Sequence, residues 1–204
     1  MLPHKRANYI PYAERGAGVQ GWEELINAIA ADYPTTANSA AENLACPDFN
    51  IPRFYLAPGR VLRYCLTGSI GVVAAANTLT LRVRWGGVAG ILLGSSGVVN
   101  LATTGGTFGF RWEGEISCRA SGPTGLLMHC GLATFSNRLY SVPPLAAELV
   151  PIMFSQGSGG AAQANVPVQV DTTTDKLLSF SAQYGTANAA NVLTTQQALL
   201  EALN

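Results

Sequence analysis

Lysine is almost absent from this chain of 204 residues, which has two lysines against ten arginines. Charged residues of both signs make up 12% of the sequence, about half of the usual share of roughly 25%. Twelve basic and twelve acidic residues cancel, so no excess of either sign points to nucleic acid, an anionic membrane or an acidic substrate. Subunit interfaces are depleted in Lys, Glu and Asp but retain Arg, so this composition is typical of a protein whose surface is covered by partners.

Long apolar runs are missing as well. The longest, 70–76 and 88–93, fall far short of the roughly 20 residues that a membrane span needs. The chain starts on polar sequence instead of a secretory leader. Its four cysteines show no CxxC spacing, which predicts reduced, mostly buried thiols in a protein made in the cytoplasm. We therefore expect neither secretion nor membrane insertion.

Residue combinations that could carry catalysis or hold a metal are scarce. His4 and His129 are the only histidines, and His129 adjoins Cys130, whose side chain would point to the opposite face of a strand. Glu113 and Glu115 alternate with arginines, which indicates cross-strand ion pairs more simply than the acid and base of a glycosidase. The sequence therefore predicts no catalytic residue, no metal ligand, no cofactor and no enzyme activity.

A local excess of positive charge lies between residues 53 and 119, where seven arginines and two glutamates give 7 − 2 = +5. Such a stretch can mark a nucleic-acid interface. Here the arginines are spread over several expected strands and no outward aromatic platform alternates with them. Salt bridges between strands or subunits explain them better, and we expect no nucleic-acid partner.

The first fifty residues differ in character from the rest. Residues 1–19 lack periodicity and predict an extended arm, and the GxGxxG pattern at 16–21 lacks the preceding buried strand of a dinucleotide site. Apolar residues then recur at i, i+3, i+4 and i+7, which predicts a short amphipathic helix over 20–31. So short a helix is marginal in water, so it must pack on its own domain or on a partner subunit. Its apolar face consists of Trp22, Leu25, Ile26 and Ile29.

From residue 51 onward, apolar and polar residues alternate with a period of two, most clearly in 60–67, 77–85 and 108–119. Turn clusters rich in glycine and serine separate these segments. The pattern predicts an all-β, antiparallel sandwich of about eight strands over 51–204, preceded by an N-terminal region 1–50 with the arm and the helix. The end of the chain is ambiguous between helix and strand, and we expect a strand because the sandwich needs a closing partner. The further expected strands are 126–135, 145–154, 166–172, 177–184 and 192–200.

Several of these motifs, taken in order, resemble those of tailed-phage structural proteins with a jelly-roll domain, a group of capsid cement (decoration) proteins and related tail and fibre subunits. The resemblance covers about residues 51–204 and rests on the order of the motifs, since each alone is weak. Residues 1–50 do not belong to the pattern. The motifs are Pro58–Tyr64 (PGRVLRY), Thr80–Gly87 (TLRVRWGG), Phe110–Arg119 (FRWEGEISCR), Val170–Tyr184 (VDTTTDKLLSFSAQY), an Asn-rich loop through Asn191, and the closing segment 192–203.

The resemblance implies a jelly roll that assembles as a homotrimer around a threefold axis and has no catalytic residues. We therefore expect a virion structural protein that binds the major capsid protein, and possibly neighbouring trimers, on the outer surface of the capsid and cements the shell. The arm and the helix face would make the contacts, as the parts outside the shared pattern. The expected contact residues are Tyr9, Ile10, Tyr12, Arg15, Trp22, Leu25, Ile26 and Ile29.

Two other functions fit the same sequence. The trimeric domain can serve as a tail, fibre or baseplate subunit, which differs from a cement protein in its place on the particle. A glycan-binding module is a third reading, because Asn-, Thr- and aromatic-rich loops can hold sugars. Trp85 and Trp112 face the expected core, however, which leaves few exposed rings for stacking on a sugar.

Overall fold

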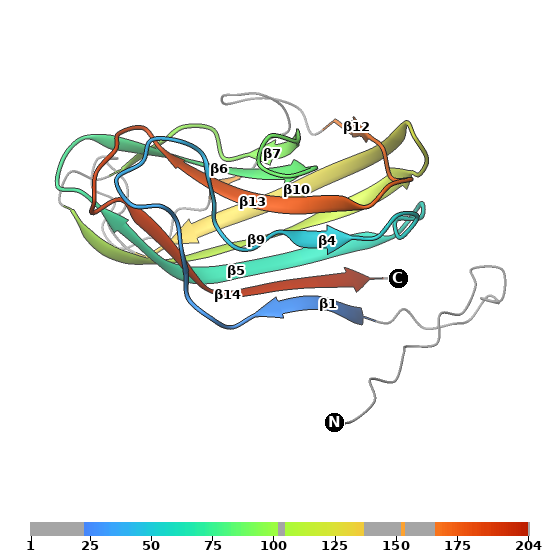
Figure 1. Cartoon of the computed structure of the whole chain (residues 1–204), viewed down its shortest axis with the longest axis horizontal. Helices are drawn as coiled ribbons and strands as arrows, with labels where there is room; N and C mark the ends of the chain where they lie inside the picture. The colour runs from blue at the N-terminus through green and yellow to red at the C-terminus, as the bar shows by residue number, and fades with distance from the viewer. Residues whose placement is uncertain (1–22, 102–104, 137–151, 154–165, 204) are drawn as a thin grey trace.

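Two antiparallel β-sheets pack face to face in the computed structural model, which describes residues 23–101, 105–136, 152–153 and 166–203 (Figure 1). All regular elements in these ranges are strands, which confirms the expected all-β antiparallel sandwich. The strands are β1 (Glu23–Ile29), β2 (Tyr33–Pro34), β3 (Asn43–Leu44), β4 (Phe49–Ile51), β5 (Val61–Val72), β6 (Asn77–Trp85), β7 (Ile91–Ser95), β8 (Val99–Leu101), β9 (Gly106–Ala120), β10 (Gly125–Phe135), β11 (Ile152–Met153), β12 (Val168–Val170), β13 (Lys176–Tyr184) and β14 (Val192–Leu203).

The larger sheet has the order β1-β14-β5-β9-β10-β11, with β2 beside β14 and β12 beside β10. The smaller sheet has the order β3-β13-β6-β7, with β4 beside β13 and β8 beside β6. The consecutive strands β5 and β6 pair with the consecutive strands β14 and β13, one pair in each sheet. β14 thus lies between β1 and β5, and β13 lies between β3 and β6. The strand expected at residues 192–203 is confirmed as β14.

The helix expected over residues 20–31 is wrong. Residues 23–29 form β1, which pairs antiparallel with β14 at the edge of the larger sheet. The register shifts between Leu25 and Asn27, so Ile26 is the extra residue of a β-bulge. Because one residue is extra, Ile26 and Ile29 both pack against the core although they are three residues apart. A bulged strand can therefore imitate the i, i+3 spacing of a helix.

The described residues from Glu23 onward belong to the sandwich. β1 and β2 pair with β14, and β3 and β4 pair with β13. The boundary expected near residue 50 therefore falls inside β4. The expected arm, 1–19, lies outside the described residues.

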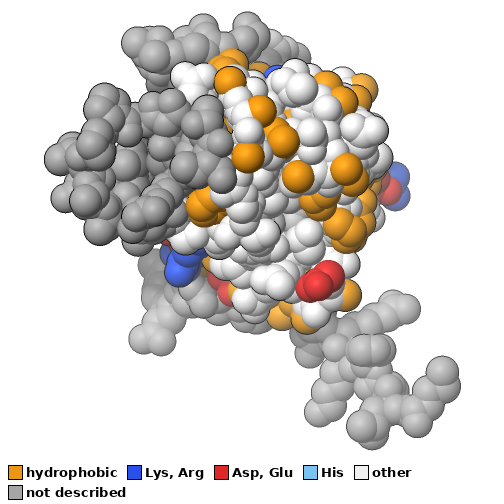
Figure 2. Space-filling model, turned by 90° about the vertical axis from the view of Figure 1, so that its left-hand side faces the viewer, with side chains coloured by type: hydrophobic (Ala, Val, Ile, Leu, Met, Phe, Trp, Pro, Cys, Tyr) orange, Lys and Arg blue, Asp and Glu red, His pale blue; other side chains and the backbone are white. Residues whose placement is uncertain are grey.

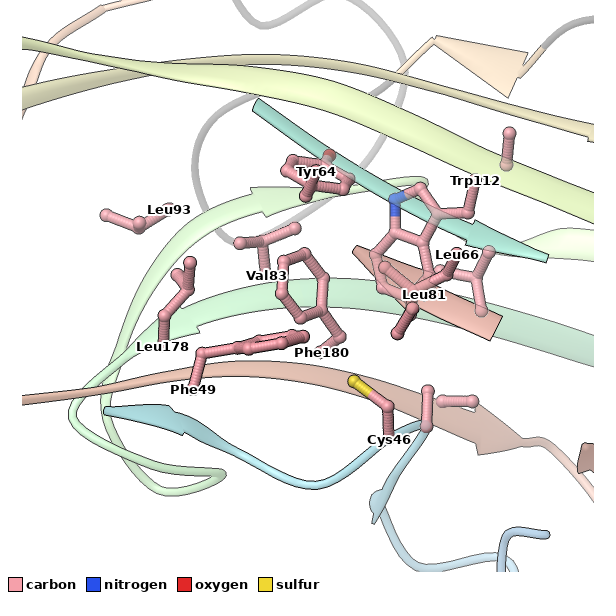
Figure 3. Close-up of a cluster of buried hydrophobic side chains, with 14 of the residues drawn as sticks. Cys46, Phe49, Tyr64, Leu66, Leu81, Val83, Leu93, Trp112, Leu178 and Phe180 are labelled. Carbon is pink, nitrogen blue, oxygen red and sulfur yellow. The ribbon is translucent and has the colours of Figure 1, made fainter. Parts of the chain in front are cut away.

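Period-two alternation places the core where the sequence predicts it. The inward residues of β5, β6 and β9 are buried and their neighbours are more exposed. At the centre, the Phe180 ring lies 4.6 Å from that of Tyr64, 5.4 Å from that of Trp112 and 5.8 Å from that of Phe49, measured between centroids (Figure 3). These four aromatic side chains join strands of both sheets into one core.

A buried polar pair lies beside this aromatic cluster. The Tyr64 hydroxyl shares a hydrogen bond of 2.7 Å with Nε2 of His129, and both side chains are almost fully buried. Tyr64 lies over Gly114 and Gly131, where an added Cβ would come within 2.5 Å of its hydroxyl oxygen. The His129 ring in turn fills the space beside Gly94 of the opposite sheet. Burial lowers the pKa of His129 to about 4, so the imidazole is neutral at pH 7.

The four cysteines are free thiols. Cys46 and Cys118 are buried, Cys65 is half-buried and Cys130 is exposed, so the expectation of mostly buried thiols holds for two of the four. His129 and Cys130 point to opposite faces of β10, as the sequence predicts.

Ion pairs account for four of the arginines between residues 53 and 119. On the outer face of the larger sheet, Arg63 pairs with Glu115 across strands at 3.4 Å, and Arg111 pairs with Glu113 along the same strand at 2.6 Å. The other two arginines belong to a single polar cluster on the outer face of the smaller sheet.

The polar cluster is built around Glu42, which lies just before β3 and reaches across β13. Its carboxylate accepts hydrogen bonds from Arg82 at 3.2 Å, from Arg84 at 2.6 Å and from the Ser181 hydroxyl. Burial raises the pKa of Glu42, but the hydrogen bonds from Arg84 and Ser181 and the two arginine charges outweigh it, so that pKa lies below its ordinary value. The ionised carboxylate therefore fastens segment 39–44 to the smaller sheet.

We expect Glu42→Ala to lower the free energy of unfolding by about 2 kcal/mol, because it leaves two largely buried guanidinium groups without their carboxylate. Glu115→Ala is the matched control, since the Glu115 side chain is 51% exposed against 16% for Glu42. An exposed pair contributes at most about 1 kcal/mol. Urea denaturation of both variants measures the difference, and equal losses would contradict the role given to Glu42.

Candidate interaction surface

The two ends of the sandwich differ in charge. We call one the arm-bearing end, because the chain enters the sandwich there at Glu23; it comprises the connections 52–60, 86–90, 120–124 and 171–176. Hydrogen bonds join its loops, from the Phe54 amide to the Thr172 carbonyl and from the Gly122 amide to the Thr172 hydroxyl. Its charged residues are Arg53, Arg60, Asp171, Asp175 and Lys176.

The start of β1 is fastened to the arm-bearing end by side chains. The Tyr55 hydroxyl donates to Oε2 of Glu24 at 2.9 Å. Arg60 lies over the Tyr55 ring, with its guanidinium carbon 4.4 Å from the ring centroid, and donates to the Tyr55 carbonyl at 2.6 Å. These contacts place the start of β1 beside this loop.

The structure separates the predicted contact residues into three groups. Leu25 is 59% exposed on β1 and remains available to a partner. Ile26 and Ile29 are partly buried against the core, so only part of each side chain is left for the predicted contact. Those outside the described residues are Tyr9, Ile10, Tyr12, Arg15 and Trp22.

Phe54 is a further exposed apolar residue at the arm-bearing end. Its side chain is 68% exposed and its backbone has φ = 60°, a left-handed conformation that is unusual for a bulky residue. The amides of its neighbours hold the turn, since Arg53 donates to Oδ1 of Asp175 and Tyr55 to the Pro52 carbonyl. No sequence signal predicted this exposure, because an aromatic residue in an alternating chain is expected in the core.

At the opposite end, the connections that the structure describes carry no charged residue. We call it the alanine-rich end and define it as residues 36–38, 73–77, 105–107 and 185–191, none of which is charged. In the space-filling view of this end, small apolar groups are scattered over the near face and most charged side chains lie toward its margins (Figure 2). Its exposed alanines are Ala37, Ala74, Ala75, Ala76, Ala187, Ala189 and Ala190.

Asparagine side chains hold the loops of the alanine-rich end together. Oδ1 of the buried Asn77 accepts hydrogen bonds from its neighbour Thr78 and from Thr186 in the β13–β14 connection. Asn191, also buried, accepts from the Val73 amide at 3.0 Å and donates to the Thr186 carbonyl at 2.9 Å. The loops are thus fixed to one another and to the strands by local hydrogen bonds.

Segment 36–38 is held against the loops of the alanine-rich end by hydrogen bonds. The Asn38 amide donates to the Asn188 carbonyl at 3.1 Å, and the Asn188 side chain accepts from the Ala190 amide. No single sequence pattern predicts this surface. The available signal was the lack of any charged residue in two distant turns, 73–77 and 185–191, but only the strand pairing shows that those turns meet.

In the ranges that the structure describes, no three His, Cys, Asp or Glu side chains gather as a metal site would require. Those ranges also contain no helix of the length and apolarity needed to cross a membrane. No protein-family model, curated protein or solved structure matches the chain.

Proposed function

We propose that this chain is a virion structural protein of a tailed phage, a cement protein that binds the major capsid protein on the outside of the shell as a homotrimer. The observation that carries the proposal is the contrast between the charged loops beside Glu23, where β1 begins, and the described loops at the other end, 36–38, 73–77, 105–107 and 185–191, which carry no charge. Surfaces that meet other subunits are depleted in charge at their centre.

The strand pairing supports the jelly-roll part of the proposal. The first long strands, β5 and β6, pair with the last two, β14 and β13, one pair in each sheet. Such nested, long-range antiparallel pairing is what a chain folded as two Greek keys produces. The arrangement also brings both ends of the sandwich domain to one place, since Glu23 pairs with Leu203.

The arm-bearing end is the side that we assign to the shell. Tyr9, Ile10, Tyr12, Arg15 and Trp22 precede β1, and a segment that becomes ordered on binding can contact a wide area of a lattice. Leu25 and Phe54 add exposed apolar surface beside its anchor. Many copies on one shell would then gain avidity through simultaneous contacts.

Removal of residues 1–22 tests this proposal. We expect the truncated chain to stay folded, because it keeps β1 and the hydrogen bond between Glu24 and Tyr55. Its affinity for shells should fall at least about 100-fold, because the arm and Trp22 are gone. The truncation must stop at Glu23, because β1 to β4 belong to the sandwich.

Co-sedimentation with cement-free shells of the encoding phage measures the affinity, with circular dichroism as the check of folding. The full-length variant Glu115→Ala is the control, because Glu115 is exposed on the outer face of the larger sheet and is not among the expected contact residues. Equal binding by the full-length and truncated chains would contradict the role given to the N-terminal residues.

A further inference from the structure

We propose that the turn 52–55, here called the anchor turn, inserts the Phe54 ring into an apolar pocket of the major capsid protein and pairs Arg53 with a carboxylate at the rim of that pocket. The inference rests on the cement role of the proposed function. It deepens that role by naming the residues that bind and the chemistry of the site that receives them. The anchor turn belongs to the connection between β4 and β5, at the end of the sandwich where β1 begins (Figure 1).

The backbone of Phe54 has a conformation that disfavours its own side chain. Among the described residues other than glycine, positive φ occurs at Asn38 and Phe54, with values of 55° and 60°. Asparagine is enriched in this left-handed region, whereas a bulky residue there is an outlier. Such strain is kept where the surrounding structure determines it, and it gathers at sites that bind a ligand or a partner. Position 54 therefore carries an aromatic ring at a cost that glycine would not have.

Hydrogen bonds hold the anchor turn in this conformation. Three successive amides donate them: Arg53 to Oδ1 of Asp175 at 2.8 Å, Phe54 to the Thr172 carbonyl at 3.0 Å, and Tyr55 to the Pro52 carbonyl at 3.1 Å. Ile51 and Leu56, on either side of the turn, are buried in the core, whereas the Phe54 side chain is 68% exposed. A partner that binds the ring does not have to order the loop, so less of the interaction energy is lost on association.

The charges of the anchor turn indicate the chemistry of the pocket. The Arg53 side chain is exposed, and its guanidinium has no hydrogen bond or ion pair with any residue that the structure describes. Two carboxylates of this end are already engaged, Asp175 by the Arg53 amide and Glu24 by the Tyr55 hydroxyl. The turn thus offers an aromatic ring and an unpaired guanidinium, side-chain types that are enriched in protein interfaces. An apolar pocket with a carboxylate at its rim is complementary to both.

The strain at Phe54 is tested by comparing Phe54→Gly with Phe54→Ala. Both variants remove the ring, so they differ only in the backbone freedom of residue 54. At an ordinary position the alanine variant would be the more stable one. Here we expect Phe54→Gly to unfold at a temperature about 2 to 4 °C higher than Phe54→Ala, because glycine adopts positive φ without strain. The opposite order would contradict the strained conformation.

The pocket is tested by co-sedimentation of full-length variants with cement-free shells of the encoding phage. Phe54→Gly and Phe54→Ala should each bind at least about 30-fold more weakly than the wild type, as expected for an aromatic residue that fills a pocket. Phe54→Tyr keeps the ring and should bind within a few-fold of the wild type. Val98→Ala is the matched control, since Val98 is an apolar residue with 70% exposure in the β7–β8 connection, and it should bind as the wild type does.

The carboxylate at the rim is tested by changing Arg53. Arg53→Glu should bind more weakly than Arg53→Gln, because it places two negative charges together. The difference should shrink as salt is added, since an exposed pair is screened. Equal binding by the two variants at low salt would contradict a carboxylate beside Arg53.

The failures are distinguishable. If the wild type binds shells and the Phe54 variants bind equally well, the anchor is wrong while the cement role stands. If the wild type does not bind shells, the cement role is wrong, and so is the partner named here. If the Phe54 variants change the mass in light scattering, the ring packs on a second copy. If Phe54→Ala lowers the unfolding temperature of the isolated chain by more than about 4 °C, the ring packs within its own chain. Either of these last two results would overturn the assignment to the capsid.

Discussion

Trp112→Ala should lower the free energy of unfolding by about 4 kcal/mol, the range found when a large buried aromatic residue is truncated. The Trp112 side chain is fully buried, and its ring meets those of Tyr64 and Phe180 edge to face at 6.2 and 5.4 Å. It therefore packs on residues of both sheets, and its removal opens a cavity at the centre of the sandwich (Figure 3). Chemical denaturation followed by circular dichroism measures the loss.

Phe54→Ala is the control for this experiment. It also removes an aromatic ring, but one that is 68% exposed, so we expect a change within about 0.5 kcal/mol. If Trp112→Ala does not fold, Trp112→Phe should fold with a smaller loss. A loss below about 1 kcal/mol for Trp112→Ala would contradict the packing described for the core.

Acid should destabilise the protein through His129. Its pKa is about 4 in the folded chain against 6.5 for an unperturbed histidine. Between these two values the unfolded chain binds the proton and the folded chain does not, so stability is complete above pH 6.5 and falls as the pH drops toward 4. The shift corresponds to a loss of about 3 kcal/mol once the pH is below 4.

The variant His129→Gln isolates this effect, because glutamine does not titrate and can still bond the Tyr64 hydroxyl. Urea denaturation gives the free energy of unfolding at pH 7.0 and at pH 4.5. The decrease between these two pH values should be about 2 to 3 kcal/mol smaller in the variant than in the wild type. His4→Gln, which changes the other histidine, should behave as the wild type does. Equal pH dependence of His129→Gln and the wild type would contradict the burial of His129 as a neutral group.

The long strands could be predicted from the sequence because alternation reports directly which side of a strand is buried. In β6, Leu79, Leu81 and Val83 are apolar at every second position, and all three are fully buried. The strand at residues 192–203 was predicted for a different reason, the need of the sandwich for a further strand, and β14 does pair with β5 along its length.

The N-terminal strand could not be predicted, because a bulge changes the period of a strand. Ile26 and Ile29 would lie on opposite faces of a regular strand, and only the extra residue between Leu25 and Asn27 puts them on the same side. Local sequence carries no sign of such a bulge. The pairing of β1 with β14 joins residues almost 180 positions apart in the chain, which periodicity within a short window does not report.

The polar cluster at Glu42 and the hydrogen bonds of the alanine-rich end could not be predicted from the sequence either, because they depend on contacts between distant segments. Glu42 lies in a stretch without periodicity, yet it binds Arg82 and Arg84. The alanine-rich end likewise depends on Asn77, the first residue of β6, and on Asn191, just before β14, which bond to loops that the fold brings together. The low share of charged residues, 12%, is visible in the sequence. Only the fold shows that several loops without charge lie together.

The most direct test of the account is the position of the chain on the phage particle. Purified particles of the encoding phage, labelled with gold-conjugated antibody against the full-length chain and viewed by electron microscopy, should carry label over the heads. Particles from a phage with the gene deleted should carry none. Label confined to tails would replace the cement role with that of a tail, fibre or baseplate subunit, and an absence of label from intact particles would contradict a virion role altogether.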